Sequence, residues 1–256
     1  MNNIELNKVA IQSIGIDTIR LPGVGSASAR GSGSLFHKSL VDAWFMSGYS
    51  NDNPPASIKG YKGYELVLKN FAFTSNSGFG GSVDHSGGTD GGKAASSYEG
   101  SLVFDGVDDY AVCDNMPIQT DYTVICRRQI WDKNNNNDAL VASKSLSYDT
   151  GAFIFEFLKN STNDQCRSFG TLSSILVEKS DSISYQTSTS YNGTNITKGT
   201  GTDTDILYLG NTRKNDNRYL YGAIYYFALY DKSLTPDEIE QEKIKLNEIW
   251  TKRLNG

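Results

Sequence analysis

Short runs of alternating apolar and polar residues recur along most of this chain. The run DYTVICRRQIW at 121–131 has the two-residue period of a half-buried β-strand. Turns rich in glycine, asparagine and aspartate separate it from similar runs, and together they predict roughly twelve short strands. The expected strands are 40–46, 65–73, 101–113 with a turn at Asp105-Gly106, 121–131, 139–144, 151–158, 168–172, 174–178, 182–191 with a turn at Asn192-Gly193, 205–209 and 220–230.

The segment 151–158 predicts a strand with an aromatic core face. Strict alternation puts Phe153, Phe155 and Phe157 on one side of such a strand. Glu156 then falls on the opposite side. We therefore expect the three rings in the core and the lone carboxylate outside it, because an isolated strand glutamate usually faces solvent.

The last part of the chain carries the signals of a capped helix after strand 220–230. Thr235 offers a side-chain oxygen to the first helical amides, Pro236 suits the first turn, and Glu238 completes the spacing of a capping box. The helix is expected to lay one apolar stripe on a sheet. That stripe consists of Ile239, Leu246 and Ile249 or Trp250. The expected fold class is all-β: a two-sheet antiparallel jelly-roll sandwich with a short C-terminal helix and an N-terminal arm.

Charge and composition narrow the possible partners. The net charge of −5 argues against binding nucleic acid, which requires a basic surface that releases counterions. No run of about 18 apolar residues is present, so membrane insertion is not expected, and the first residues lack the pattern of a signal peptide. The three cysteines are too few for a disulfide framework, and we expect them to be buried strand residues.

Residues 1–37 differ in composition from the rest of the chain. They combine short β-branched runs with the flexible stretch GVGSASARGSGS. We expect an N-terminal arm or linker at 1–37 that attaches the chain elsewhere, followed by one β domain at 38–256. A loose tail or an edge strand of the same domain is the alternative.

Six segments in order resemble one family of β domains. They are LVFDGVDDYAV, DYTVICRRQIW, ALVASK, SYNGTNITKG, DILYLGN and YLYGAIYYFALYDKSLTPDEI. Over approximately residues 39–250 the chain is similar to the concanavalin A-like, laminin-G-like jelly-roll domain. The resemblance implies a concave sheet whose face or rim loops hold ligands such as sugars. Some members of the family bind calcium through an acidic pair near the final strand, but Tyr225 and Tyr226 stand at those positions here.

A looser resemblance concerns LVDAWFMSGYSNDNPP and NFAFTSNSGFGG. These segments are similar to structural proteins of phages of gut bacteria, such as fibre, capsid decoration or tail proteins. The resemblance implies a virion location after synthesis in the host cytoplasm. The partners would then be phage structural proteins or further copies of this chain in a homo-oligomer, with surface glycans as ligands.

Aromatic and amide side chains supply the candidate ligand-binding residues. Sugar rings stack on tyrosine and tryptophan, and asparagine or aspartate pairs with their hydroxyls. Tyr219, Tyr221 and Tyr225 are expected to share one face of the closing strand. The full set is Tyr49, Asn51, Asp52, Trp131, Asn211, Tyr219, Tyr221 and Tyr225. Packing inside the sandwich or in an oligomer interface is the alternative role of these tyrosines.

Asp105, Asp108 and Asp109 form the candidate metal site. Their carboxylates are hard oxygen ligands of the kind that Ca²⁺ prefers, and no other cofactor is expected. Aspartate before glycine also stabilises tight turns, and turn chemistry is the preferred interpretation of the cluster, with the metal site as the alternative.

No catalytic residues are expected. Glycoside hydrolysis requires two carboxylates roughly 5 to 10 Å apart, and the chain has no closely spaced acids on one strand. Glu156 and Glu178 could converge from neighbouring strands, which leaves a glycan-cleaving enzyme as an alternative. The leading hypothesis is a non-enzymatic recognition module, and a third possibility is a structural subunit without a ligand.

Overall fold

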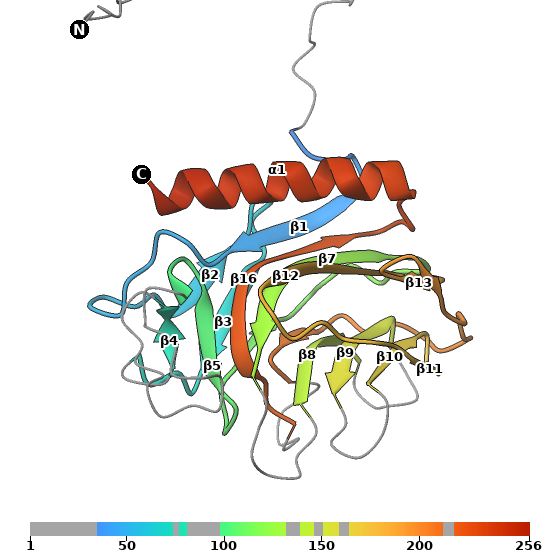
Figure 1. Ribbon diagram of the computed structural model, residues 1–256, viewed down its shortest axis with the longest axis horizontal. Coiled ribbons are helices and arrows are strands. Elements are labelled where there is room, and N and C mark those ends of the chain that lie inside the picture. Colours follow the sequence, from blue (N-terminus) through green and yellow to red (C-terminus); the bar gives the residue numbers. More distant parts are fainter. Residues whose placement is uncertain are drawn as a thin grey trace, which may run out of the picture. The chain divides into compact units, whose positions relative to one another are not determined.

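The computed structural model describes residues 35–73, 77–80, 98–131, 139–145, 151–158, 164–211 and 218–256. In these residues the chain forms two antiparallel sheets of eight strands each and one helix, α1 (Pro236–Leu254) (Figure 1). The fold class is therefore an all-β sandwich with a short C-terminal helix. No helix in the described part of the chain combines the length and apolar character needed to cross a membrane.

Sheet A is organised around its longest strand. It contains, in spatial order, β14 (Thr194–Asn195), β13 (Ser190–Tyr191), β12 (Ser182–Thr187), β7 (Thr123–Ile130), β16 (Tyr221–Tyr230), β5 (Leu102–Asp105) and β4 (Gly78–Phe79), with β1 (Leu40–Phe45) also paired to β16. Strand β16 pairs with β7 along one edge. Along its other edge it pairs first with β5 and then with β1, so three strands are registered on this one element.

Sheet B packs against sheet A. It contains, in spatial order, β11 (Thr171–Ser174), β10 (Gln165–Ser168), β9 (Phe153–Leu158), β8 (Ala139–Lys144), β15 (Leu207–Leu209), β6 (Tyr110–Cys113), β3 (Glu65–Lys69) and β2 (Ser57–Lys59). The chain passes from sheet A to sheet B in the short turn between β5 and β6.

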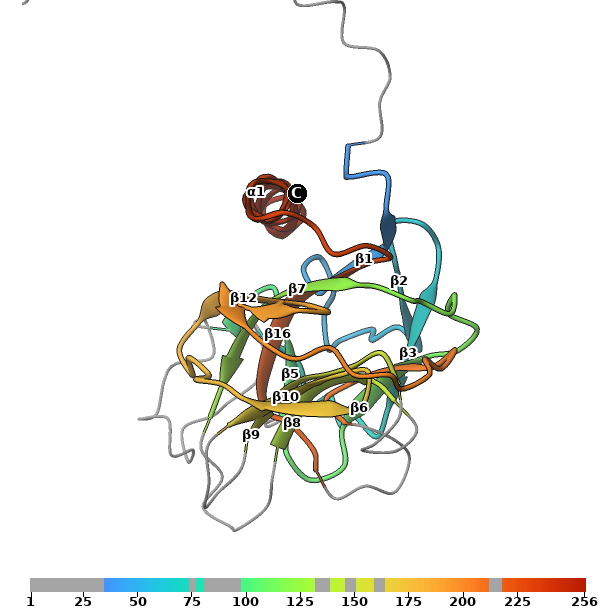
Figure 2. The ribbon, with the colours of Figure 1, turned by 90° about the vertical axis from the view of Figure 1, so that its right-hand side faces the viewer.

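Two hydrophobic layers hold the elements together. The first lies between the sheets and contains Trp44, Phe104, Ile224 and Phe227. The second lies between sheet A and α1, where the end-on view shows the helix above the sheet (Figure 2). Ile239, Leu246 and Trp250 are the buried apolar residues of α1, as the helical spacing predicts. Sheet A is thus covered on both faces, which explains why nearly all of β16 is buried.

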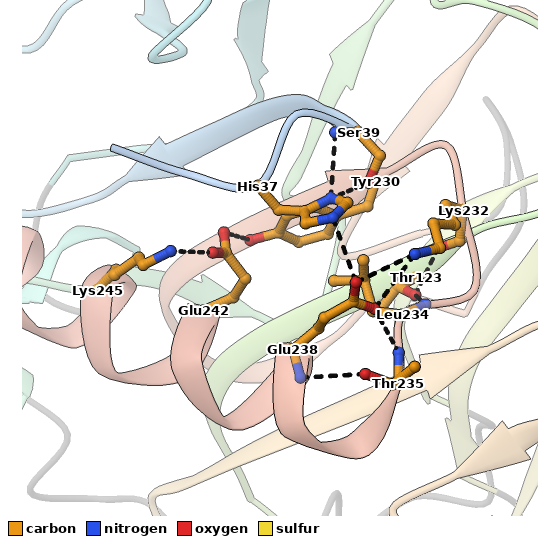
Figure 3. A network of polar contacts seen from close by, with 10 residues as sticks. All are labelled: His37, Ser39, Thr123, Tyr230, Lys232, Leu234, Thr235, Glu238, Glu242 and Lys245. Atoms are coloured by element: carbon orange, nitrogen blue, oxygen red, sulfur yellow. Dashed lines mark hydrogen bonds and ion pairs between the residues drawn. The ribbon is translucent and has the colours of Figure 1, made fainter. Parts of the chain in front are cut away.

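The start of α1 has the predicted cap. The Thr235 side chain accepts a hydrogen bond from the amide of Glu238, and the Glu238 carboxylate accepts one from the amide of Thr235. Figure 3 shows that the same carboxylate also contacts Lys232 and His37. Since His37 lies just before β1, this contact joins the start of β1 to the start of α1.

A bulge in β9 breaks the alternation expected from the sequence. In β9, Glu156 has φ +53° and the register with β10 shifts there. Phe155 and Glu156 therefore both face the core between the sheets. Phe157 packs with Ile154 in a separate cluster on the opposite face of the strand. The prediction that the three phenylalanines share one face, with the carboxylate outside the core, is wrong. Strict alternation fails because Glu156 adopts a left-handed backbone conformation and forms a bulge, which reverses the facing of the residues that follow.

The strands expected at 168–172 and 174–178 also differ from the structure. The chain turns at Phe169 and Gly170, which both have positive φ, so β10 and β11 form a hairpin where one strand was expected. Residues 175–180 form no strand. Phe169 is buried although it lies in the turn. An apolar residue at this position therefore does not mark a continuous strand.

The expected arm at 1–37 falls mostly outside the described residues, which begin at Leu35. Phe36 belongs to the β domain, since it is buried and its ring meets that of Tyr61 edge-on at 4.9 Å. The arm itself stays a prediction. All three cysteines are buried and unpaired, as expected.

Candidate functional site

A cavity opens where the end of β1, strand β4 and the end of α1 meet. Its volume is about 330 Å³, within the range of small-ligand sites. The side chains that line it include Tyr49, Ser50, Phe79, Glu99, Ser101 and Leu254. We call it the Tyr49 cavity. Four segments that are distant in sequence thus form one hollow with rings, hydroxyls and a carboxylate on its walls.

Aromatic stacking fixes the position of Tyr49. Its ring stacks on Phe79 with centroids 5.1 Å apart and an interplanar angle of 29°. Asn51 holds the two segments together: its side-chain oxygen accepts a hydrogen bond from the Phe79 amide at 2.7 Å, and its amide group donates one to the Phe79 carbonyl at 3.2 Å. Gly78 is needed beside it, because a Cβ at this residue would lie 2.6 Å from the Asn51 oxygen. Asn51 therefore positions the cavity wall.

Arg253 lies against the Tyr49 ring, and Glu99 lines the same cavity. The Arg253 guanidinium carbon lies 5.7 Å from the ring centroid, and its Nη2 donates to the Tyr49 hydroxyl at 3.5 Å. Glu99 is exposed, and no ion pair holds it among the described residues. A cavity with aromatic walls, a carboxylate in its lining and a guanidinium close to one of its rings can bind a small polyhydroxylated ring by apolar contacts and by hydrogen bonds to its hydroxyls.

The structure brings together only some of the predicted ligand-binding residues. Tyr49 lines the cavity, Asn51 shapes it, and Asp52 is exposed in the same turn, where its amide donates to Ser50 Oγ. Trp131 and Asn211 are buried elsewhere in the molecule, so neither is open to a ligand in this conformation.

The tyrosines of the closing segment pack inside the molecule. Tyr221 and Tyr225 do lie on the same face of β16, but α1 covers that face. The Tyr225 ring has the Arg127 guanidinium carbon 4.8 Å from its centroid and Trp250 edge-on at 5.7 Å. Tyr219 is buried before the strand begins. These contacts match the packing alternative for the tyrosines.

A bulge explains the unusual density of tyrosine on this face. The register between β16 and β7 shifts between Ile224 and Tyr226, so Tyr225 and Tyr226 both point toward the helix layer. Burial raises the pKa of both phenols well above the ordinary value. Buried neutral phenols do not provide the carboxylate oxygens of a calcium site, so calcium does not fit this part of β16.

The predicted carboxylate cluster does assemble. One oxygen from each of Asp105, Asp108 and Asp109 lies within 4.8 Å of the other two. Asp105 Oδ1 accepts hydrogen bonds from the amides of Val107 and Asp108, which is the turn chemistry expected before Gly106. Burial raises the pKa of Asp109 to about 7, and the negative charges of Asp105 and Asp108 add to the effect. Burial also raises the pKa of Asp108.

Glu156 and Glu178 do not form a catalytic pair. Glu156 is fully buried, and both of its oxygens accept hydrogen bonds from Arg128 at 2.6 Å. Glu178 is exposed and binds Ser180. A carboxylate in the core and another in solvent cannot flank one glycosidic bond.

Sequence reasoning missed Phe79, Glu99 and Arg253. Phe79 lies in a glycine-rich stretch between the expected strands 65–73 and 101–113, and Arg253 lies in the last turn of α1. Arg253 is 204 residues away from Tyr49 in the sequence, so only the tertiary structure brings them together. No local signal in the sequence could have paired them.

A second hollow lies between α1 and the β7–β12 side of sheet A, over Arg127. Its charged groups already pair with one another. Arg127 binds Asp181 through two hydrogen bonds at 2.9 and 2.8 Å, and Lys243 binds Glu240 at 2.7 Å. Few polar groups are thus left for a ligand, which makes the Tyr49 cavity the better candidate.

Comparisons with known proteins identify the fold. No family model and no curated protein matches the chain. Among solved structures, Trypanosoma rangeli sialidase in complex with sialic acid matches 85% of this chain at a TM-score of 0.52 and 12% identity. The same sialidase with 2,3-difluorosialic acid, as a covalent intermediate, matches 88% at a TM-score of 0.53 and 13% identity. This chain covers 34% and 36% of those two chains.

A third solved structure is the botulinum neurotoxin serotype D ligand-binding domain in complex with N-acetylneuraminic acid. It matches 82% of this chain at a TM-score of 0.48 and 10% identity, which is too distant to support an argument. The sialidase matches, of which the chain spans about a third, define the class: an antiparallel two-sheet β-sandwich. At 12 to 13% identity the likeness shows the fold alone.

Proposed function

We propose that this chain is a non-enzymatic recognition module that binds a sugar in the Tyr49 cavity. The observation that carries the proposal is the half-buried Tyr49 ring, which lines the cavity together with Glu99 and whose hydroxyl accepts a hydrogen bond from Arg253. The rings of Tyr49 and Phe79 supply an apolar part of the cavity wall, against which the C–H groups of a pyranose can pack. The guanidinium donates to hydroxyls and the carboxylate accepts from them. Because Glu99 would repel an acidic sugar, the expected ligand is a neutral one.

The sandwich fold is compatible with this role and does not decide it, because one fold supports many functions. The sialidases that share the fold are enzymes, and the chain covers about a third of each. In the Tyr49 cavity the tyrosine hydroxyl contacts the Arg253 guanidinium, which cannot act as a base. Glu99 is the only carboxylate among the described lining residues. Binding without cleavage therefore fits the site better than hydrolysis.

We further propose a virion role for the chain. The N-terminal arm at 1–37 would attach it to a phage particle or to further copies of itself, and the sandwich would face surface glycans. The support is the sequence resemblance of 40–55 and 70–81 to phage structural proteins. Copurification of the protein with phage particles tests this part, and its absence from purified virions would contradict it.

Glycan-array screening tests the binding proposal. We expect the intact chain to bind neutral glycans on the array. We also expect it to release no reducing sugar from the glycans that it binds. Release of sugar would favour the glycan-cleaving alternative. Silence on the array, together with a stable homo-oligomer in light scattering, would favour a structural subunit without a ligand.

A further inference from the structure

The turn between β5 and β6 gathers three carboxylates, and no cation among the described residues pairs with them. Asp105 is half-buried, Asp108 is exposed and Asp109 is 1% exposed. No lysine, arginine or histidine forms an ion pair with any of them in the described part of the chain. Three carboxylates at this distance repel one another, and the innermost also loses its hydration.

One oxygen of the innermost carboxylate has no partner. Asp109 Oδ2 accepts a hydrogen bond from the Asp105 amide at 2.9 Å. Asp109 Oδ1 is buried and makes no hydrogen bond within 3.5 Å among the described residues, while the Ser77 hydroxyl lies near enough to the carboxylate to lower its pKa. Buried polar atoms are nearly always satisfied, and an exception often marks a missing ion or water. This orphaned oxygen is independent of the turn chemistry, which uses Asp105 Oδ1.

We propose that Asp105, Asp108 and Asp109 bind one Ca²⁺ ion. Calcium coordinates oxygen at about 2.3 to 2.6 Å, so the ligands around one ion lie up to about 5 Å apart. The separation of at most 4.8 Å between the three oxygens meets this limit. Calcium is favoured over Mg²⁺, because Mg²⁺ demands an octahedron with ligands at about 2.0 to 2.1 Å. The exposed side at Asp108 leaves room for the water ligands that complete the shell.

The site lies where the chain crosses between the sheets. Asp105 ends β5 in sheet A, and Asp109 directly precedes β6 in sheet B. An ion held by both would tie the two sheets together at this end of the sandwich. The folded protein would bind calcium and the unfolded chain would not, so calcium would stabilise the fold. This inference does not depend on sugar binding.

Calcium titration of the chelator-treated full chain tests the proposal. We expect one Ca²⁺ per chain by calorimetry, and saturating CaCl₂ to raise the melting temperature by about 5 °C, with MgCl₂ at the same concentration giving less than half of that shift. Absence of binding at millimolar calcium would overturn the proposal, and so would an equal effect of magnesium.

Two variants and a control locate the ion. Asp109→Asn and Asp108→Asn should each weaken calcium binding by at least about tenfold, as expected when a charged ligand is lost. Because Asp109→Asn also removes a buried charge, the readout is the calcium-dependent shift and not the melting temperature itself. Asp108 is exposed, so its variant keeps the test valid if Asp109→Asn does not fold. The control is Asp231→Asn in the exposed turn after β16, and a loss of calcium binding there equal to that of the two variants would contradict the assignment.

Discussion

At the scale of single residues, the interaction that depends most on the assembled sandwich is the ion pair of Arg128 and Glu156. Both side chains are fully buried between the sheets. Two hydrogen bonds of 2.6 Å join them, and the Tyr191 hydroxyl donates to the same carboxylate at 2.7 Å. The guanidinium also donates to Ser184 Oγ at 2.8 Å. The pair connects β7 of sheet A to β9 of sheet B, so its partners are satisfied only in the assembled sandwich.

Glu156→Gln should lower the free energy of unfolding by about 3 to 5 kcal/mol, because it leaves the Arg128 charge buried without a counter-charge. Urea denaturation followed by tryptophan fluorescence measures the change. The matched control is Asp181→Asn, which breaks the partly exposed pair with Arg127 and should change stability by less than about 1 kcal/mol. A Glu156→Gln variant as stable as that control would contradict this account of the pair.

At the scale of elements, hydrogen bonds and ion pairs fix the position of α1 at both of its ends. At its start, the capping box and the contacts of Glu238 with His37 and Lys232 fix the first turn (Figure 3). Toward its end, the Trp250 indole donates to the Gly100 carbonyl at 2.8 Å, and the Ser47 hydroxyl donates to the Trp250 carbonyl at 3.1 Å. The helix therefore holds the wall of the Tyr49 cavity in place and covers sheet A.

The stability that Glu238 contributes should depend on pH. The hydrogen bond from the Thr235 amide, helped by Lys232, lowers the pKa of Glu238 to about 2. Since the folded pKa is below the unfolded one, the contribution is present at neutral pH and is lost as the pH falls from about 4.5 to about 2. Wild type and Glu238→Gln should differ by roughly 1 kcal/mol at pH 7, because the group is largely solvated.

Urea unfolding of both proteins at pH 7 and near pH 2 measures this difference, which should shrink at the lower pH. Glu240→Gln serves as the control, since Glu240 lies on the same helix outside the cap and pairs only with Lys243 among the described residues. A difference between wild type and Glu238→Gln that is the same at both pH values would contradict the assignment of the low pKa to the cap.

The sequence predicted those elements whose signals are local. The cap at Thr235 depends on residues within four positions, and most strands follow from the two-residue period. The bulges at Glu156 and Tyr225 could not be predicted in this way, because a bulge depends on the register with a neighbouring strand. Each bulge puts two consecutive side chains on one face, which is why Glu156 entered the core.

At the scale of the whole molecule, the sandwich and its helix form three layers. Sheet A lies in the middle, so the aromatic residues of its longest strand serve packing. The residues that line the Tyr49 cavity come from four distant segments, and the approach of Tyr49, Glu99 and Arg253 to one another is a tertiary property. Asn51 and Tyr49 were predicted because aromatic and amide residues cluster in one turn, and the rest of the site required the structure.

The most direct test of the central claim is calorimetric titration of a neutral glycan that binds on the array into matched tyrosine variants. Tyr49→Ala should weaken binding by at least about tenfold, because it removes an aromatic ring from the cavity wall. Tyr49→Phe should keep most of the affinity, since it removes only the hydroxyl. Tyr61→Ala removes a half-exposed ring on Phe36 outside the Tyr49 cavity and should bind like the wild type. Equal affinity of Tyr49→Ala and the wild type would contradict the account.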